Sequence, residues 1–144
     1  MRSWFLATLL LAACNSAPLP DEAGRPTPEQ TATALSPGTT PVRIGEQGPS
    51  FAACGIGGVV LAPAIPVHAA PFEEAKVAGT LEQGHPLFVC TRSIDQRWLG
   101  IVAPPVATPE DGCGVASPVV GRRSYDGPCL SGWVPAAAIR ARAR

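Results

Sequence analysis

The apolar positions of this chain fall into short clusters separated by turn-forming residues. Four runs of β-branched, aromatic and leucine residues are bounded by Gly, Pro and Asp: residues 58–61, 87–90, 98–102 and 132–134. Such runs are typical of short β-strands. No window of helix length has a sustained apolar stripe, and we expect only residues 136–139, after Pro135, to form a single helical turn. The pattern therefore predicts an all-β fold, either a small barrel or a sandwich.

A longer apolar run, residues 4–13, stands alone near the start of the chain and follows the positive charge of Arg2. A bilayer core of roughly 30 Å needs about 20 apolar residues, so this run is too short to cross it. Its length and its small final residues are those of the hydrophobic region of a signal peptide. We therefore expect residues 1–13 to be a signal peptide and the remainder to be exported.

The next segment, residues 14–50, is rich in proline and contains no Phe, Trp or Tyr. Proline removes an amide donor and fixes φ, and little apolar surface is present to offset the entropy lost on ordering. We predict an extended linker that is partly polyproline-like, with about 3.1 Å per residue where it takes that form. A Pro-rich recognition segment is the alternative, although only short Pro-x-Pro pairs occur.

Four of the five cysteines lie in the domain predicted for residues 51–144: Cys54, Cys90, Cys113 and Cys129. In an exported protein an even number of cysteines indicates disulfides, and three pairings are open. We favour Cys54–Cys90 with Cys113–Cys129, because the second bridge closes a loop rich in Gly, Pro and Ser, where it contributes about 3 kcal/mol. A metal site is the alternative, but Cys-x-x-Cys is absent and His68 and His85 lack ligand spacing.

The fifth cysteine, Cys14, directly follows the predicted signal peptide. The sequence of residues 11–14, LAAC, resembles the lipobox of bacterial lipoproteins. This resemblance implies that the Cys14 thiol is diacylated, that the chain is cut before it, and that the new amine is also acylated. Two or three acyl chains anchor firmly, since each buried CH₂ contributes about 0.8 kcal/mol. Asn15, being other than Asp, implies sorting to the outer membrane, facing the periplasm. A signal peptide with a chance cysteine is the alternative.

Three segments of the domain together resemble the bacterial SH3-like family. They are residues 77–89, VAGTLEQGHPLFV, residues 98–102, WLGIV, and residues 132–135, GWVP, which Ile139 follows. The family has a Gly-x-Leu and a further Gly before an apolar strand, then a strand led by Trp, and a closing Gly-Trp-Val. The resemblance implies a small SH3-like barrel, stapled here by two disulfides and carrying one long insertion between Val102 and Gly132.

The cysteines add a narrower resemblance, to a cysteine-containing subgroup of these proteins in alphaproteobacteria. The matching motifs are Cys54-Gly55, a strand ending in Cys90, Cys113-Gly114-Val115 and residues 127–134, GPCLSGWV. The likeness covers most of residues 53–139. One segment departs from the family, because residues 65–71, IPVHAAP, stand where Leu-x-Val-Arg-x-Gly-Pro is usual. In wall-binding members this loop borders the ligand groove, so the departure weighs against transferring wall binding.

The domain contains no recognisable catalytic set. The cysteines are assigned to disulfides, the histidines are few, and no Gly-x-Ser-x-Gly motif is present. We therefore expect a protein without enzymatic activity, cofactor or metal. In so small a domain the aromatic residues are expected mainly in the core. Tyr125 and Trp133 are the candidates for exposure along a groove, where they would stack on a peptide or sugar, with core packing as the favoured alternative.

The chain has 11 basic and 11 acidic residues and no formal net charge. Its late arginines therefore make a local patch and no global field: Arg122, Arg123, Arg140, Arg142 and Arg144. Anionic lipid headgroups and wall peptides are suitable partners, with a solubilising tail as the alternative, whereas export excludes nucleic acid. We expect an outer-membrane lipoprotein whose domain binds an envelope protein or peptidoglycan. The alternative is a structural or accessory subunit of an envelope complex without a ligand.

Overall fold

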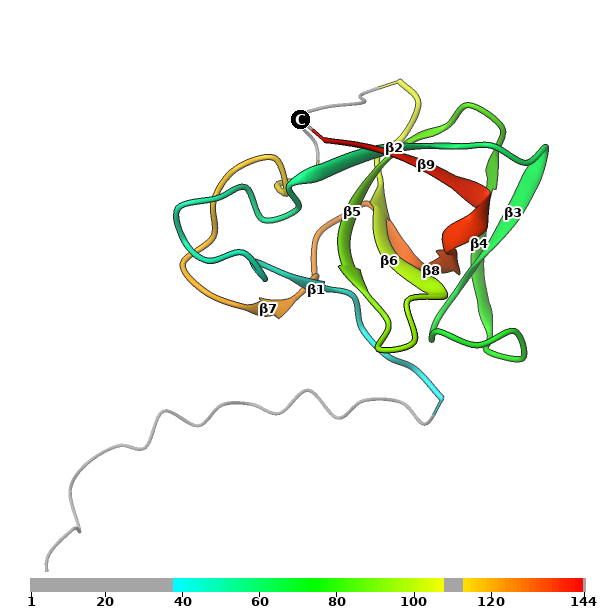
Figure 1. Cartoon of the computed structure of the whole chain (residues 1–144), viewed down its shortest axis with the longest axis horizontal. Coiled ribbons are helices and arrows are strands. Elements are labelled where there is room, and N and C mark those ends of the chain that lie inside the picture. The colour runs from blue at the N-terminus through cyan, green and yellow to red at the C-terminus, as the bar shows by residue number, and fades with distance from the viewer. Residues whose placement is uncertain (1–37, 108–112, 144) are drawn as a thin grey trace, which may run out of the picture. The chain divides into compact units, whose positions relative to one another are not determined.

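The computed structural model describes residues 38–107 and 113–143, which form strands and turns without an α-helix (Figure 1). The strands are β1 (Arg43–Ile44), β2 (Ile56–Val60), β3 (Ala64–His68), β4 (Val77–Glu82), β5 (Pro86–Arg92), β6 (Trp98–Ala103), β7 (Arg123–Ser124), β8 (Leu130–Pro135) and β9 (Ile139–Ala143). A 3₁₀ turn, η1 (Ala136–Ala138), precedes β9, where the sequence predicts a single helical turn. The prediction of an all-β fold is confirmed.

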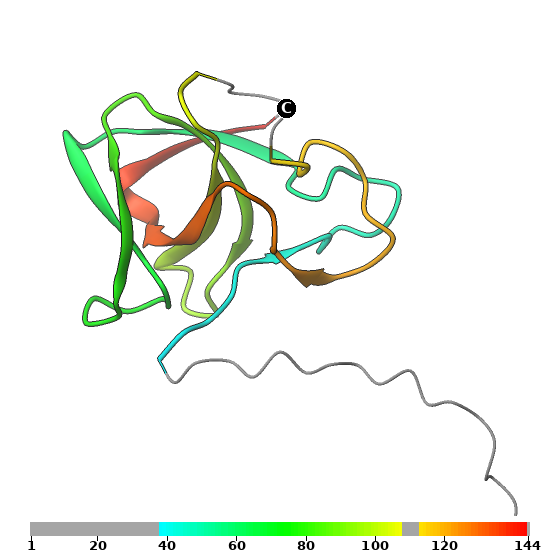
Figure 2. The same cartoon turned by 180° about the vertical axis from the view of Figure 1, so that it is seen from behind.

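Seven of these strands form one antiparallel sheet in the order β4-β3-β8-β6-β5-β2-β9, and β1 pairs with β7 in a separate two-stranded sheet. The larger sheet curves strongly, which brings the start of β9 toward the β3–β4 hairpin (Figures 1 and 2). However, β4 and β9 each have a single hydrogen-bonded neighbour. The sheet is therefore not closed into a barrel, in contrast to the expectation from the sequence.

Side chains on the two faces of the central strands belong to two different cores. Leu87 and Val89 of β5 point into the main core, whereas Phe88 between them points into the second. This alternation follows from the period of two residues along a strand. Strand β6 is buried along its whole length because both of its faces are covered. Its continuous apolar sequence is the pattern expected of a strand without a solvent face.

The second core is built by the segment before β2 and by the insertion between β6 and β8. Val42 and Ile44, from the first of these, are 2% and 1% exposed. Ile44 packs with Phe88 of β5 and with Val115 of the insertion. The predicted linker extends to residue 50, so this boundary is too late. Apolar residues between the prolines contribute to the folded domain.

Both predicted disulfides are present, with the favoured pairing. Cys54–Cys90 joins the segment before β2 to β5, across a sequence separation of 36 residues. Cys113–Cys129 closes the end of the insertion just before β8, across 16 residues. The predicted signal peptide, the lipid attachment at Cys14 and most of the predicted linker lie outside the described residues.

Candidate functional site

Trp133 of β8 lies against the face of the sheet opposite the main core. Its cross-strand neighbour on β6 is Gly100, where a Cβ would stand 3.5 Å from the indole Cη2. The indole Nε1 donates a hydrogen bond of 2.6 Å to the carbonyl oxygen of Thr40. Trp133 is 5% exposed. Most of this side chain is therefore packed in the fold, as the core-packing alternative expects.

Burial of the indole results from the chain segment that enters the domain. The Thr40 amide donates to the carbonyl oxygen of Ala69, and the Tyr125 amide donates to that of Val42. These bonds fix residues 40–42 across the sheet, beside the indole. The sequence prediction placed this segment in the linker, so the cover over Trp133 was missed.

One edge of the same indole borders a hollow of about 650 Å³. Its walls are formed by the entering segment, the β3–β4 loop, the end of β5 with the β5–β6 turn, and β8. The lining residues are Thr40, Pro41, Arg43, Pro71, Thr91, Arg92, Ser93, Ile94, Asp95 and Trp133. A volume of this size suits part of an extended ligand, and binding hollows characteristically combine an apolar lining with a few polar groups.

The β5–β6 turn is held in one shape by its own polar groups. Ser93 Oγ donates to Asp95 Oδ1, and the Trp98 amide donates to Ser93 Oγ over 3.0 Å. The Arg97 amide donates to Asp95 Oδ1 over 3.1 Å. The Ser93 hydroxyl and, secondly, the Arg97 amide hold the pKa of the Asp95 carboxyl below its ordinary value. The turn therefore has a defined shape and carries a carboxylate at neutral pH.

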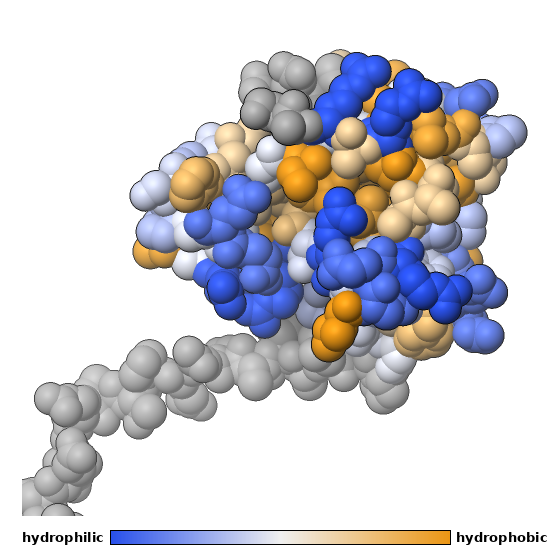
Figure 3. Space-filling model, in the orientation of Figure 1, coloured by the Kyte–Doolittle hydropathy of each residue, from blue (hydrophilic) through white to orange (hydrophobic). Residues whose placement is uncertain are grey.

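This turn presents Ile94 to solvent, with a relative exposure of 101%. In the space-filling view the surface at the turn is hydrophilic apart from a hydrophobic projection (Figure 3). A single exposed apolar side chain is common on proteins. Ile94 differs because it lies at the edge of the hollow on a turn that its neighbours hold in place. It is the residue best placed to contact a ligand there.

Arg43 and Arg92 bring positive charge to the hollow, and Asp95 brings negative charge. Arg43 Nε lies 3.2 Å from Glu46 Oε1, so its charge is partly compensated. Arg92 forms no ion pair with another residue within the described ranges. Its guanidinium is exposed and free to bind a carboxylate. No sequence signal points to Arg92 or Ile94, because neither belongs to a motif.

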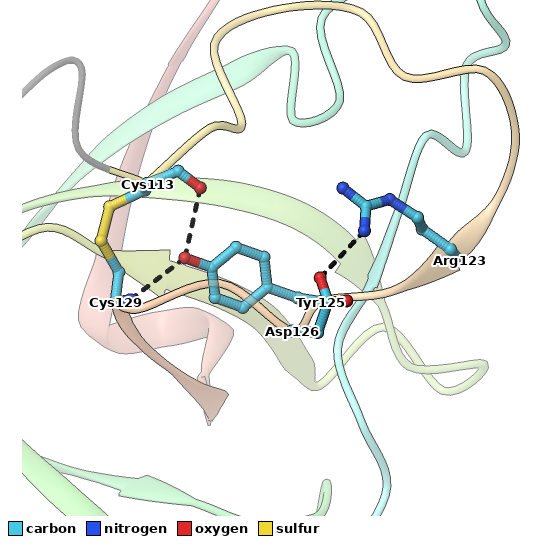
Figure 4. Close-up of polar contacts among 5 residues, drawn as sticks. All are labelled: Cys113, Arg123, Tyr125, Asp126 and Cys129. Carbon is cyan, nitrogen blue, oxygen red and sulfur yellow. Dashed lines mark hydrogen bonds and ion pairs between the residues drawn. A yellow bond between two sulfur atoms is a disulfide. The ribbon is translucent and has the colours of Figure 1, made fainter. Parts of the chain in front are cut away.

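Tyr125 does not line this hollow and packs instead against the second core. Its hydroxyl donates to the Cys113 carbonyl oxygen over 3.2 Å and accepts from the Cys129 amide over 3.1 Å (Figure 4). The side chain is half-buried, so its predicted exposure is met only in part. Tyr125 holds the two ends of one disulfide together and does not share a groove with Trp133.

The two histidines have structural contacts. His68 is buried, its Nδ1 lies 3.1 Å from the Ala75 carbonyl oxygen, and its ring meets Trp98 edge-on at 5.4 Å. His85 Nε2 lies 2.9 Å from the Pro104 carbonyl oxygen. Throughout residues 38–107 and 113–143, no three His, Cys, Asp or Glu side chains gather where they could hold a metal ion.

Comparison of the chain with family models, curated proteins and solved structures finds no match.

In the part of the chain that the structure describes, no helix has the length and apolar character needed to cross a membrane.

Proposed function

We propose that this protein is a lipoprotein of the cell envelope, anchored at Cys14, whose SH3-like domain binds a peptide segment without catalysis. The hollow beside Trp133 is the proposed binding site. The observation that carries the proposal is the combination, at its edge, of two exposed residues: Ile94 on a turn held by hydrogen bonds, and Arg92 at the end of β5, which has no ion pair among the described residues.

The order of the strands supports the SH3-like part of the proposal. The Gly-x-Leu motif lies in β4, the next apolar run in β5, the Trp-led run in β6 and the closing Gly-Trp-Val in β8. Each motif of the resemblance thus occupies a separate strand of one sheet, and β6 pairs with both β5 and β8. Residues of the insertion between β6 and β8 build a second core on the other face of this sheet, against Phe88 and Val102, so the insertion adds to the fold without interrupting it.

The lining of the hollow supports a peptide as the ligand. Pro41, Pro71, Ile94 and the edge of Trp133 offer apolar and aromatic surface, which extended peptides use in aromatic-lined grooves. Arg92 offers a planar cation that matches a carboxylate in two-point geometry. A ligand with an apolar side chain and a nearby carboxylate would satisfy both features. Proteins of the envelope and the peptide stems of peptidoglycan both provide such groups.

Sedimentation with purified wall sacculi tests whether the wall is the source of this peptide. If the wall is the source, the domain sediments with sacculi, and Ile94→Ser weakens this binding about tenfold, because the substitution removes an apolar group from the edge of the site. Val120→Ser is the matched control, since Val120 is 99% exposed and does not line the hollow. If the wild-type domain stays in the supernatant, peptidoglycan is not the ligand.

Mass spectrometry of the N-terminal peptide tests the anchor separately. We expect the peptide that begins at Cys14 to carry the mass of two or three acyl chains, and the Cys14→Ser variant to lack it. An unmodified Cys14 in protein isolated from its own cells would overturn the lipoprotein part of the proposal and leave the binding site untouched.

A further inference from the structure

Strand β9 carries two arginines on one face. Arg140 and Arg142 are exposed and are separated by one residue, so their side chains leave the strand in the same direction. They pair in register with Val59 and Gly57 of β2. Among the described residues, the other side of β9 has no strand neighbour, because β9 is the last strand of the sheet. In Figure 3 strongly hydrophilic side chains mark the edge along which β9 runs.

These two arginines differ from those of the insertion in their partners. Arg122 Nε lies 3.4 Å from Glu46 Oε2, and Arg123 Nη1 lies 2.9 Å from Asp126 Oδ1. Within the described residues, neither Arg140 nor Arg142 has an ion pair or a side-chain hydrogen bond. Their guanidinium groups are therefore available to an external anion.

Apolar surface adjoins the arginines. Leu61 is 37% exposed, and its amide donates to the Ala138 carbonyl oxygen, which places it beside the start of β9. Val59, the register partner of Arg140, is half-buried. A surface with arginine next to partly exposed aliphatic groups fits the boundary between headgroups and acyl chains, where cations meet phosphates and apolar groups enter the interface.

We propose that this β9 face, formed by Arg140, Arg142, Val59 and Leu61, binds the surface of a membrane that contains anionic phospholipids. Arginine matches phosphate oxygens in two-point geometry. We choose a bilayer as the binding partner because the arginines, which have no acidic partner among the described residues, lie beside apolar side chains. That a bilayer is close to the domain rests on the proposed lipid anchor. The face has no residue in common with the hollow, so the domain could hold a membrane and a peptide at once.

Vesicle sedimentation tests this proposal with residues 14–144 carrying Cys14→Ser, which excludes both the apolar run 4–13 and any acyl chain. Vesicles are made of phosphatidylcholine alone or with about 30% phosphatidylglycerol. The variant Arg140→Gln/Arg142→Gln removes the proposed contacts. The matched control, Arg122→Gln/Arg123→Gln, removes the same charge from arginines that have acidic partners. Thermal melts of all three proteins confirm that each is folded.

We expect the parent protein to bind the anionic vesicles and not the neutral ones. Each arginine near an anionic surface contributes about 1 kcal/mol, so we expect Arg140→Gln/Arg142→Gln to bind the anionic vesicles about 30-fold more weakly than the parent protein. The control pair should bind within about threefold of the parent. Absence of binding to anionic vesicles, or equal losses in both double variants, would overturn the proposal. Because no acyl chain is present, these outcomes are independent of whether Cys14 is lipidated and of what the hollow binds.

Discussion

Gly132 of β8 and Gly100 of β6 have no side chain, and atoms of neighbouring elements occupy the space that a Cβ would take. A Cβ on Gly132 would stand 2.5 Å from the His68 carbonyl oxygen and 2.6 Å from Val67 Cγ1. The glycine therefore lets β3 approach β8 closely, at the single register pair that joins these two strands. Gly100 plays a similar part on the other face, where the side chain of Thr91 and the Trp133 indole lie above it. Glycine inside a strand commonly marks such a close approach.

Gly132→Ala should lower the free energy of unfolding by about 2–4 kcal/mol, because the new methyl group meets backbone that cannot move without breaking the β3–β8 pairing. Gly121→Ala is the control, since a Cβ there meets nothing within 4 Å. Urea denaturation of both variants measures the difference. Equal stabilities of the two variants would show that β3 does not lie against β8 as described.

At the scale of the elements, the strands with strong apolar runs were predictable and the others were not. The runs at 87–90, 98–102 and 132–134 lie within β5, β6 and β8, and the run at 58–61 overlaps β2. Strand β3 was missed because Pro66 interrupts its apolar pattern. A proline has no amide hydrogen to donate, but the strand tolerates it because β8 pairs only with the last residue of β3. Strand β9 was missed because alternating Arg and Ala have low β-propensity. Its place in the sheet comes from its register with β2.

The segment that contains β1 was also missed, because prolines and small residues around it resemble a linker. Val42 and Ile44 carry too short an apolar signal to predict a strand on their own. They become buried only because the insertion, more than seventy residues later in the sequence, supplies β7 and Val115 as partners. This long-range contact is what moves the start of the folded domain ahead of residue 51.

Ile44→Ala tests whether this segment belongs to the domain. Ile44 is 1% exposed in the second core, so its truncation should cost about 2–5 kcal/mol of unfolding free energy. Ile94→Ala makes the same chemical change at a fully exposed position and should leave stability within about 0.5 kcal/mol. Thermal or urea denaturation compares the two. A negligible change in unfolding free energy for Ile44→Ala would show that the segment around Ile44 belongs to the linker and not to the folded domain.

At the scale of the whole molecule, the hollow brings together parts of the chain that are distant in sequence. Its walls come from Thr40, Pro41 and Arg43, from Pro71, from residues 91–95 and from Trp133. No local pattern predicts such a site, because its lining comes from four separate stretches of the chain. The sequence did single out Trp133, for its aromatic ring and for the Gly-Trp-Val segment that resembles SH3-like domains. Tyr125, the other candidate, lies at the second disulfide and does not line the hollow.

The most direct test of the central claim, that the hollow binds a peptide ligand, is photocrosslinking in the cells that make the protein. A photoreactive aromatic amino acid would replace Ile94 at the edge of the hollow or, as the control, the equally exposed Val120. We expect a discrete adduct from position 94 only, with a peptide as the attached group, either of an envelope protein or of the wall. No adduct at position 94, or the same adducts from both positions, would contradict the account.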